Sequence, residues 1–224
     1  MNKINFVMLA CIAVSLLYWF SGASVLMTEY LAFSGENLLQ GKVWTLFTGL
    51  FLHADVVHLI GNMLFLYVFG NTLENELKAE KTLAAFFTGG VLAFLLSTFF
   101  YSPSDVMIGA SAAIFTLTAI VMLVKPLKFS FIFLMPQGLV AIVCFTYNVL
   151  AVFFGEQSNV AYISHVIGFA IGIAFGAAWS QKLGQEPPHN SGFVSHLPRN
   201  HHFSYSTTGA SLILKPSARC RIKT

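Results

Sequence analysis

Long apolar runs between charged residues constrain the possible folds of this chain more than any other feature of its sequence. Each of six such runs approaches the roughly 20 residues that a helix needs to span a hydrocarbon core. The runs cover residues 4–20, 56–73, 82–102, 106–124, 137–154 and 158–180. With 56% hydrophobic and 9% charged residues, the chain is far from the composition of a soluble domain. We therefore expect an all-α, polytopic membrane protein whose six transmembrane helices form one domain, residues 1–181.

The first apolar run has a second interpretation, a cleaved signal peptide. Lys3 precedes the run, and the small residues Ser21, Gly22 and Ala23 follow it, as at a signal-peptide cleavage site. The apolar region of a signal peptide usually has only about 7 to 15 residues, fewer than the run 4–20. We therefore favour a first transmembrane helix.

The positions of Lys and Arg predict the orientation of the helices, because cytoplasmic loops carry an excess of basic residues. If the N-terminus is cytoplasmic, only Lys42 of the 12 basic residues falls outside. The others fall inside: Lys3, Lys78, Lys81, Lys125, Lys128, Lys182, Arg199, Lys215, Arg219, Arg221 and Lys223. Since the sequence shows no transit peptide, we expect a multi-pass protein of the cell (inner or plasma) membrane with both termini cytoplasmic. The net charge of +3 then reflects orientation, and we expect no nucleic-acid partner.

Residues 182–224 differ in composition from the rest of the chain. Pro187 and Pro188 precede scattered histidines, a Ser/Thr-rich stretch and a basic end. This pattern is typical of a disordered cytoplasmic tail, whose basic end we expect to contact anionic membrane lipid. The histidines have no regular ligand spacing, so a solvated linker is a better interpretation than a metal site: His189, His196, His201 and His202.

Metal and cofactor chemistry has no support elsewhere in the sequence. Cys11, Cys144 and Cys220 form no CxxC pair and have no Cys/His ligand spacing. The sequence also contains no P-loop, no dinucleotide-binding glycine fingerprint and no HExxH zinc motif. We expect neither a disulfide framework nor a metal nor another cofactor.

Two polar residues inside apolar runs point to a functional site. Ser111 lies in the run 106–124, and His165 lies in the run 158–180. A serine alone commonly bonds its own helix backbone, and a lone intramembrane histidine can be a proton relay, a ligand or a packed residue. Together, the two match the nucleophile and the base of a serine hydrolase.

Three polar residues have a similar calculated depth in their helices. Counted from the last charged residue on the outer side, Asn62, Ser111 and His165 lie seven, six and nine residues along the chain. At 1.5 Å per residue, each lies roughly 9 to 13 Å into its helix. We expect the three side chains to meet at the outer mouth of the bundle. His58, four residues before Asn62, shares its helical face, although both could equally be polar contacts between helices.

Small residues predict that the helices carrying Ser111 and His165 pack closely. Gly109 and three alanines surround Ser111, and a ridge of small residues borders His165. Such ridges let two transmembrane backbones approach, which would bring hydroxyl and imidazole within hydrogen-bonding reach. The ridge residues recur every four positions: Ser164, Gly168, Gly172 and Gly176.

Three segments resemble motifs of the rhomboid intramembrane serine proteases. Gly109-Ala110-Ser111 with Phe115 is similar to the family's G-x-S-x-x-x-F or Y nucleophile segment. His165 with Gly168 and Gly172 is similar to its A-H-x-x-G-x-x-x-G segment. The stretch from Phe51-Leu52-His53 to Met63, which includes His58 and Asn62, is similar to F-L-H-x-x-x-x-H-L-x-x-N-M. The resemblance covers about residues 40–180.

The resemblance implies a six-helix rhomboid-like bundle and a role for each matching residue. Ser111 would be the nucleophile and His165 the general base, with no third acidic member required. Phe115 would stack on the imidazole. The side chains of His58 and Asn62 and the backbone N–H of Ser111 would donate hydrogen bonds to the oxyanion. The supporting glycines of the motifs would be Gly109, Gly168 and Gly172.

The resemblance also implies an activity, a serine endopeptidase that cleaves transmembrane segments of other membrane proteins near the outer face. Its partners would be those substrates and membrane lipid, and the sequence does not indicate an oligomeric state. One alternative is a catalytically silent rhomboid-like protein that binds membrane-protein clients. A channel or transporter with His58 and His165 on a proton path is less well supported, because we find neither paired acidic residues in the spans nor internal repeats.

Three residues depart from the family pattern. Thr45 follows Trp44 where the family commonly has arginine, and Ser164 precedes His165 where alanine is usual. Lys78 stands where glycine is common. We expect Thr45 to affect loop anchoring, not the predicted dyad, and Lys78 to affect regulation or stability. Ser164 is a small-for-small change that should preserve packing.

Overall fold

Helices make up nearly all the secondary structure in this computed structural model, which describes residues 2–155 and 160–183. The long helices are α1 (Ile4–Phe20), α5 (Val56–Phe65), α6 (Asn71–Ser97), α7 (Ser111–Val124), α8 (Gln137–Phe154) and α9 (Tyr162–Leu183). A π-helical turn, η2 (Leu66–Gly70), joins α5 to α6. The expectation of a mainly helical fold is confirmed. The predicted tail, with its histidines and basic end, lies outside the described residues apart from the last two residues of α9.

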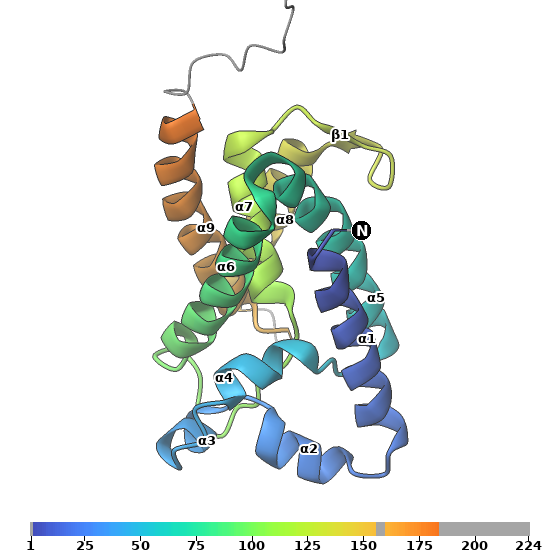
Figure 1. Ribbon diagram of the computed structural model, residues 1–224. Helices are drawn as coiled ribbons and strands as arrows, with labels where there is room; N and C mark the ends of the chain where they lie inside the picture. Colours follow the sequence, from blue (N-terminus) through green and yellow to red (C-terminus); the bar gives the residue numbers. More distant parts are fainter. Residues whose placement is uncertain (1, 156–159, 184–224) are drawn as a thin grey trace, which may run out of the picture. The chain divides into compact units, whose positions relative to one another are not determined.

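Short elements lie at the two ends of the helical unit (Figure 1). Between α1 and α5, the chain forms α2 (Ser24–Leu31), α3 (Gly35–Leu39), α4 (Thr45–Thr48) and a 3₁₀ turn, η1 (Gly49–Phe51). At the opposite end, β1 (Phe129–Ser130) and β2 (Met135–Pro136) form an antiparallel pair. These two-residue strands are a local departure from helical structure, and the all-α class of the fold is unaffected. The pairing satisfies backbone polar groups where the connection from α7 to α8 leaves helical conformation.

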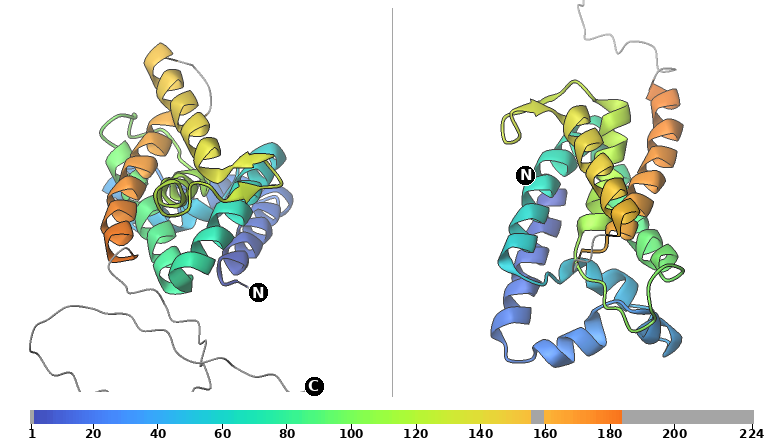
Figure 2. Two further views of the ribbon diagram at one scale, coloured as in Figure 1. Left: turned by 90° about the horizontal axis from the view of Figure 1, so that it is seen from above. Right: turned by 180° about the vertical axis from the view of Figure 1, so that it is seen from behind.

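Helix α7 lies among the other long helices and forms the centre of the unit (Figure 2, left, yellow-green). Nine of its 14 residues are buried, and five of them belong to a core cluster that includes side chains of α1, η2 and α6. On the outside, large apolar side chains remain uncovered: Phe20, Val57 and Phe153 are 80%, 82% and 80% exposed. Exposed apolar side chains are suited to contact with lipid. The helices can lie in lipid because each forms its backbone hydrogen bonds internally.

Three stretches of the described chain are both long and apolar enough to cross a membrane: Val56–Ser97, Gln137–Phe154 and Tyr162–Trp179. Ile4–Phe20 and Ser111–Val124 are apolar but have only 17 and 14 residues. Val56–Ser97 is not one continuous helix, because Lys78 interrupts it with φ of 69° and ψ of 163°. The chain is therefore a multi-pass membrane protein, and the count of six spans stays a prediction.

Several helix boundaries differ from the predicted ones. The run 106–124 is helical only from Ser111, and the run 82–102 stops being helical after Ser97. Before Ser111, the chain forms a β-bridge between Met107 and Phe33, and Gly109 takes a φ of +114°. The run 56–73 continues in helical turns to Lys78, and the run 158–180 corresponds to Tyr162–Leu183. Apolar composition alone cannot distinguish a buried extended segment from the helix that follows it.

The break at Lys78 predicts that glycine would stabilise the protein at this position. Its φ and ψ fall in a region that side chains other than glycine occupy at a cost of about 1–3 kcal/mol. Part of the gain is lost because glycine has more freedom in the unfolded chain. We therefore expect Lys78→Gly to raise the free energy of unfolding by about 1 kcal/mol, measured by denaturation in detergent micelles.

Lys81→Gly is the matched control for this prediction. Lys81 is exposed and has helical backbone, so the same substitution there should lower the free energy of unfolding by about 1 kcal/mol. A loss of stability at both positions would contradict the strain inferred at Lys78.

Candidate active site

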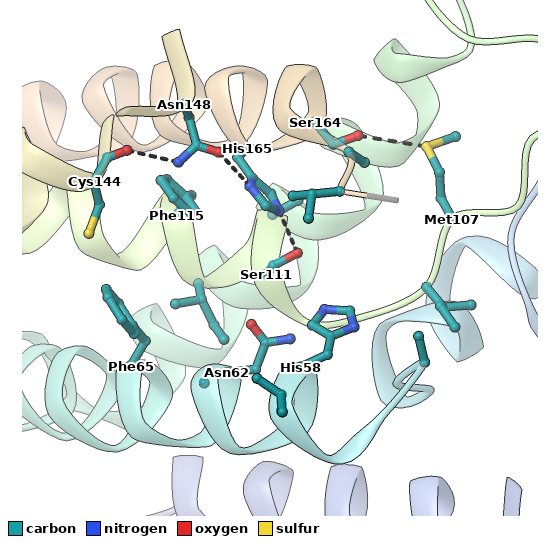
Figure 3. A pocket seen from close by; sticks show the side chains of 18 of the residues that line it. His58, Asn62, Phe65, Met107, Ser111, Phe115, Cys144, Asn148, Ser164 and His165 are labelled. Atoms are coloured by element: carbon teal, nitrogen blue, oxygen red, sulfur yellow. Dashed lines mark hydrogen bonds between the residues drawn. The ribbon is translucent and has the colours of Figure 1, made fainter. Parts of the chain in front are cut away.

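A pocket of about 750 Å³ lies between α5, α7, α8 and α9 (Figure 3). Its lining is mainly apolar, with a few polar side chains that converge on one region. All four side chains predicted for the dyad and the oxyanion lie there: His58, Asn62, Ser111 and His165. Among residues 2–155 and 160–183, no group of three or more His, Cys, Asp or Glu side chains could hold a metal ion.

Ser111 and His165 are joined by a direct hydrogen bond within the pocket (Figure 3). The distance from Ser111 Oγ to His165 Nε2 is 2.7 Å, although the two residues are 54 positions apart. The imidazole is buried and stacks on Phe115, with ring centroids 4.7 Å apart and planes within 6°. The hydroxyl group is thus held against a ring nitrogen that could accept its proton.

Ser111 is the first residue of α7, which corrects the depth calculated from the sequence. Asn62 is the seventh residue of α5 and His165 the fourth of α9, so the three do not lie equally far along their helices. The error arises because residues 106–110 are not helical. The correction has a chemical consequence: the first N–H groups of a helix lack intrahelical acceptors and lie at its positive end. The backbone N–H of Ser111 can therefore donate to an anion.

Gly109 shapes the segment that leads into Ser111. Its φ of +114° is a conformation that residues with a Cβ rarely adopt. Its N–H donates to the carbonyl oxygen of Gly49 at 2.9 Å, which ties this segment to η1. A Cβ atom at this position would lie 2.7 Å from Cε1 of His58, so the ring of His58 occupies the space beside Gly109.

His58 and Asn62 face Ser111 from α5 (Figure 3). Asp55 begins this helix by accepting a hydrogen bond from the backbone N–H of His58 at 2.8 Å. Asn62 is 8% exposed, and its buried Nδ2 has no hydrogen-bond partner among the described residues. A buried donor without a partner costs about 1–3 kcal/mol, so this amide is poised to bind an acceptor that enters the pocket.

His53 anchors the segment that precedes α5. Its ring is buried, its Nδ1 lies 3.0 Å from Ser15 Oγ on α1, and its carbonyl oxygen accepts a hydrogen bond from Trp19 Nε1 at 2.9 Å. Burial and the neighbouring ring of His58, 5.1 Å away, lower the pKa of His53 to about 4. His53 is therefore neutral at pH 7 and serves to fix the position from which α5 starts.

The small-residue ridge of α9 packs directly on α7. A Cβ atom on Gly168 would collide with the carbonyl oxygen of Ala112, and one on Gly172 with that of Thr116. Thr116 Oγ1 also donates to the carbonyl oxygen of Gly168 at 2.9 Å. Ser164, the first position of the ridge, faces α6 instead, where its Oγ lies 2.7 Å from that of Ser97. This close packing positions His165 beside Ser111.

Asn148, on α8, contacts the imidazole but was not among the predicted site residues (Figure 3). Its Oδ1 lies 2.7 Å from His165 Nδ1, and its Nδ2 donates to the carbonyl oxygen of Cys144 at 2.8 Å. The available signal was an amide inside an apolar run, where a polar side chain needs a partner. Sequence spacing could not identify that partner, because the packing of α8 against α9 decides it.

Comparison with known proteins agrees with this geometry. Residues 40–182 match the family model described as the rhomboid domain. "Rhomboid-like protease 2" of Toxoplasma gondii is 28% identical over 140 residues, 62% of this chain and 50% of that protein. "Rhomboid-like protein 11, chloroplastic" of Arabidopsis thaliana is 40% identical over 78 residues, 35% and 28% of the two chains.

A third relative, "Rhomboid protease GlpG" of Salmonella typhi, is 28% identical over 97 residues, 43% of this chain and 35% of that protein. The chain thus spans about half the length, or less, of these curated relatives. The family model nevertheless covers more than half of the chain and includes every residue of the pocket described above. The chain belongs to the rhomboid family.

Proposed function

We propose that this protein is an intramembrane serine endopeptidase with Ser111 as nucleophile and His165 as general base. The observation that carries the proposal is the 2.7 Å hydrogen bond between Ser111 Oγ and His165 Nε2 in a pocket of about 750 Å³. Stacking on Phe115 and packing of α9 on α7 keep the imidazole in place. A nucleophile activated by an adjacent base is the arrangement that acyl transfer requires.

The reaction proceeds through an acyl-enzyme. His165 Nε2 accepts the proton of the Ser111 hydroxyl as Oγ attacks the scissile carbonyl carbon, which forms a tetrahedral oxyanion. The imidazolium returns that proton to the leaving amine, and the peptide C–N bond breaks. Water then attacks the ester with His165 again as base, which releases the new carboxyl terminus and restores the Ser111 hydroxyl.

Three donors stabilise the oxyanion. They are the backbone N–H at the start of α7, the amide of Asn62 and the ring of His58. The unpartnered Nδ2 of Asn62 supports this role, because the developing negative charge supplies the acceptor that the amide lacks. A preorganised donor of this kind contributes about 2.7–4 kcal/mol to the reduction of the barrier.

Six membrane spans are proposed: α1, residues 56–77 and 79–97 on either side of the break at Lys78, and α7, α8 and α9. The 14 residues of α7 rise about 21 Å, less than the roughly 30 Å hydrocarbon core. Because α7 is shorter than the hydrocarbon core, Ser111 at its start lies below the membrane surface. Residues 106–110 span the remaining thickness. A substrate transmembrane segment must therefore unwind locally to expose a peptide bond, which favours Gly, Pro and small polar residues at the cleaved region.

In the proposed orientation, the protein lies in the plasma membrane with both termini in the cytoplasm. The start of α1 and the end of α9 lie at the same end of the helical unit (Figure 1). Basic residues gather at that end: Lys125 pairs with Glu76 at 3.2 Å, and Lys81 lies 6.0 Å from the ring of Trp179. Lys42 contacts Tyr30 at the other end. This distribution supports the positive-inside assignment, and it puts Ser111 nearer the outer face.

Reaction with a fluorophosphonate tests the proposal directly, because such reagents label activated serines. We expect purified protein in lipid vesicles to be labelled at Ser111, as identified by mass spectrometry of its peptides. The same vesicles should cleave a single-span substrate whose transmembrane segment contains a Gly- and Ser-rich region near the outer surface.

Ser111→Ala and Ser104→Ala are the matched variants for this experiment. Ser104 is exposed in the connection between α6 and α7, so its replacement should leave labelling and cleavage intact, whereas Ser111→Ala should lose both. Folded wild-type protein that neither reacts nor cleaves would overturn the proposal. It would favour the silent rhomboid-like protein that only binds membrane-protein clients.

A further inference from the structure

The side chains of Asn148, His165 and Ser111 form a continuous chain of hydrogen bonds across three helices (Figure 3). We propose that Asn148 is a positioning residue that holds His165 with Nδ1 protonated and Nε2 free to take the proton of Ser111. This inference rests on the proposed proteolytic function, since it assigns a third member to the same site. The third member is a neutral amide carried by α8, at a site where the resemblance to the rhomboid family requires no third acidic member.

The direction of the amide follows from its second contact. The carbonyl oxygen of Cys144 can only accept a hydrogen bond, and it lies 2.8 Å from the Asn148 amide. The NH₂ group must therefore face Cys144, because the opposite orientation would set two carbonyl oxygens against each other. This assignment directs Oδ1, which can only accept, toward His165 Nδ1 at 2.7 Å.

The direction of the amide then determines the tautomer of the imidazole. Since Oδ1 accepts, His165 Nδ1 must carry a hydrogen. A neutral imidazole has only one N–H, so Nε2 keeps its lone pair. Ser111 Oγ lies 2.7 Å from Nε2 and therefore donates its hydroxyl proton to it. The hydrogen-bonding capacity of the three side chains is thus consistent with only one neutral arrangement, the one competent for general-base catalysis.

Phe115 cannot make this selection. Its ring stacks on the imidazole with planes within 6°, which fixes the plane of the ring but not which edge faces Ser111. A half-turn of the imidazole about its Cβ–Cγ bond would preserve the stacking and move both nitrogens. The hydrogen bond to Asn148 opposes this half-turn. Because Asn148 is only 5% exposed, water does not replace this hydrogen bond. The same order of nucleophile, histidine and asparagine serves papain-like proteases on an unrelated fold.

A purely structural role for Asn148 makes different predictions. If the side chain only fills space, an apolar residue of the same branched shape should replace it. Asn148→Leu keeps that shape and the number of heavy atoms and removes both hydrogen bonds, so it separates packing from positioning. Thr146→Leu is the matched control, because Thr146 lies on the same helix and is exposed.

The first measurement is steady-state cleavage of a transmembrane substrate in vesicles. We expect Asn148→Leu and Asn148→Ala to lower kcat by about 10²-fold with KM changed less than threefold, because a misplaced base slows chemistry without altering substrate contacts. Thr146→Leu should behave as wild type. Normal kcat in Asn148→Leu would overturn the inference while the proposed protease function remained intact.

The second measurement does not depend on turnover. ¹⁵N NMR of histidine-labelled protein reports which ring nitrogen is protonated, and His165 is assigned by the signals lost in a His165→Gln sample. Wild-type protein at neutral pH should show His165 with Nδ1 protonated and Nε2 unprotonated, and Asn148→Leu should show a mixture or the opposite tautomer. If Asn148→Leu kept the wild-type signature, the positioning role would be refuted. If the signature changed as expected but no variant cleaved substrate, the inference would hold and the proteolytic function would fail.

Discussion

Replacing Ser111 by alanine is expected to reduce turnover by at least about 10⁴-fold, and adding His165→Asn should cost little more. In the proposed mechanism the two side chains act in one step, the transfer of the hydroxyl proton to Nε2 over the 2.7 Å hydrogen bond. Once either is absent, the other has no proton to move or to accept. Single and double variants should therefore converge on the same residual rate, measured as cleavage of a transmembrane substrate in vesicles.

The non-additivity is the informative part of this prediction. Independent contributions would multiply, so two 10⁴-fold losses would give about 10⁸-fold for the double variant. Partial unfolding would also remove activity. Each variant therefore needs a denaturation curve in detergent. Ser104→Ala controls for the serine substitution itself and should keep wild-type turnover. Multiplicative losses in well-folded variants would argue against a cooperating dyad.

Gly172→Val is expected to destabilise the protein by about 1–3 kcal/mol and to lower turnover by about 10²-fold. A Cβ atom there would collide with the carbonyl oxygen of Thr116 and lie 2.7 Å from Cβ of Ala119. Neither atom can rotate away, so α9 must move from α7. Because α9 carries His165 and α7 carries Ser111, that movement stretches the hydrogen bond of the dyad.

Gly61→Val is the control for stability. A Cβ atom at position 61, on α5, would meet no atom within 4 Å. Denaturation in detergent should show little loss for Gly61→Val and a clear loss for Gly172→Val. Substrate cleavage by the folded fraction of Gly172→Val then measures the displacement of the dyad. Equal stability of the two variants would contradict the tight contact between α7 and α9.

The amino-acid sequence predicted the helical class of the fold, the boundaries of α1 and α8, and the family. These predictions were possible because the length of each apolar run between charged clusters must match the thickness of a membrane, whatever the tertiary packing. The ridge around Gly168 and Gly172 was recognisable for a similar reason: small residues every four positions occupy one face of any helix.

The start of α7 and the role of Asn148 could not be predicted in this way. Residues 106–110 are as apolar as the helix that follows, and only the pairing of Met107 with Phe33 and the φ of Gly109 distinguish them. A single asparagine in an apolar run needs a hydrogen-bond partner. The sequence does not identify His165, 17 residues later, as that partner. Both outcomes depend on contacts between segments distant along the chain.

From the sequence alone, then, come the membrane environment, the helical fold and the candidates for the reactive side chains, since hydropathy and residue chemistry are local properties. The tertiary structure alone decided that Ser111 is the first residue of its helix, that α9 packs backbone to backbone on α7, and that Asn148 reaches the far side of the imidazole. Hydrogen bonds form only within about 3 Å. The angles at which helices cross determine which polar groups come that close, and no spacing along one helix specifies those angles.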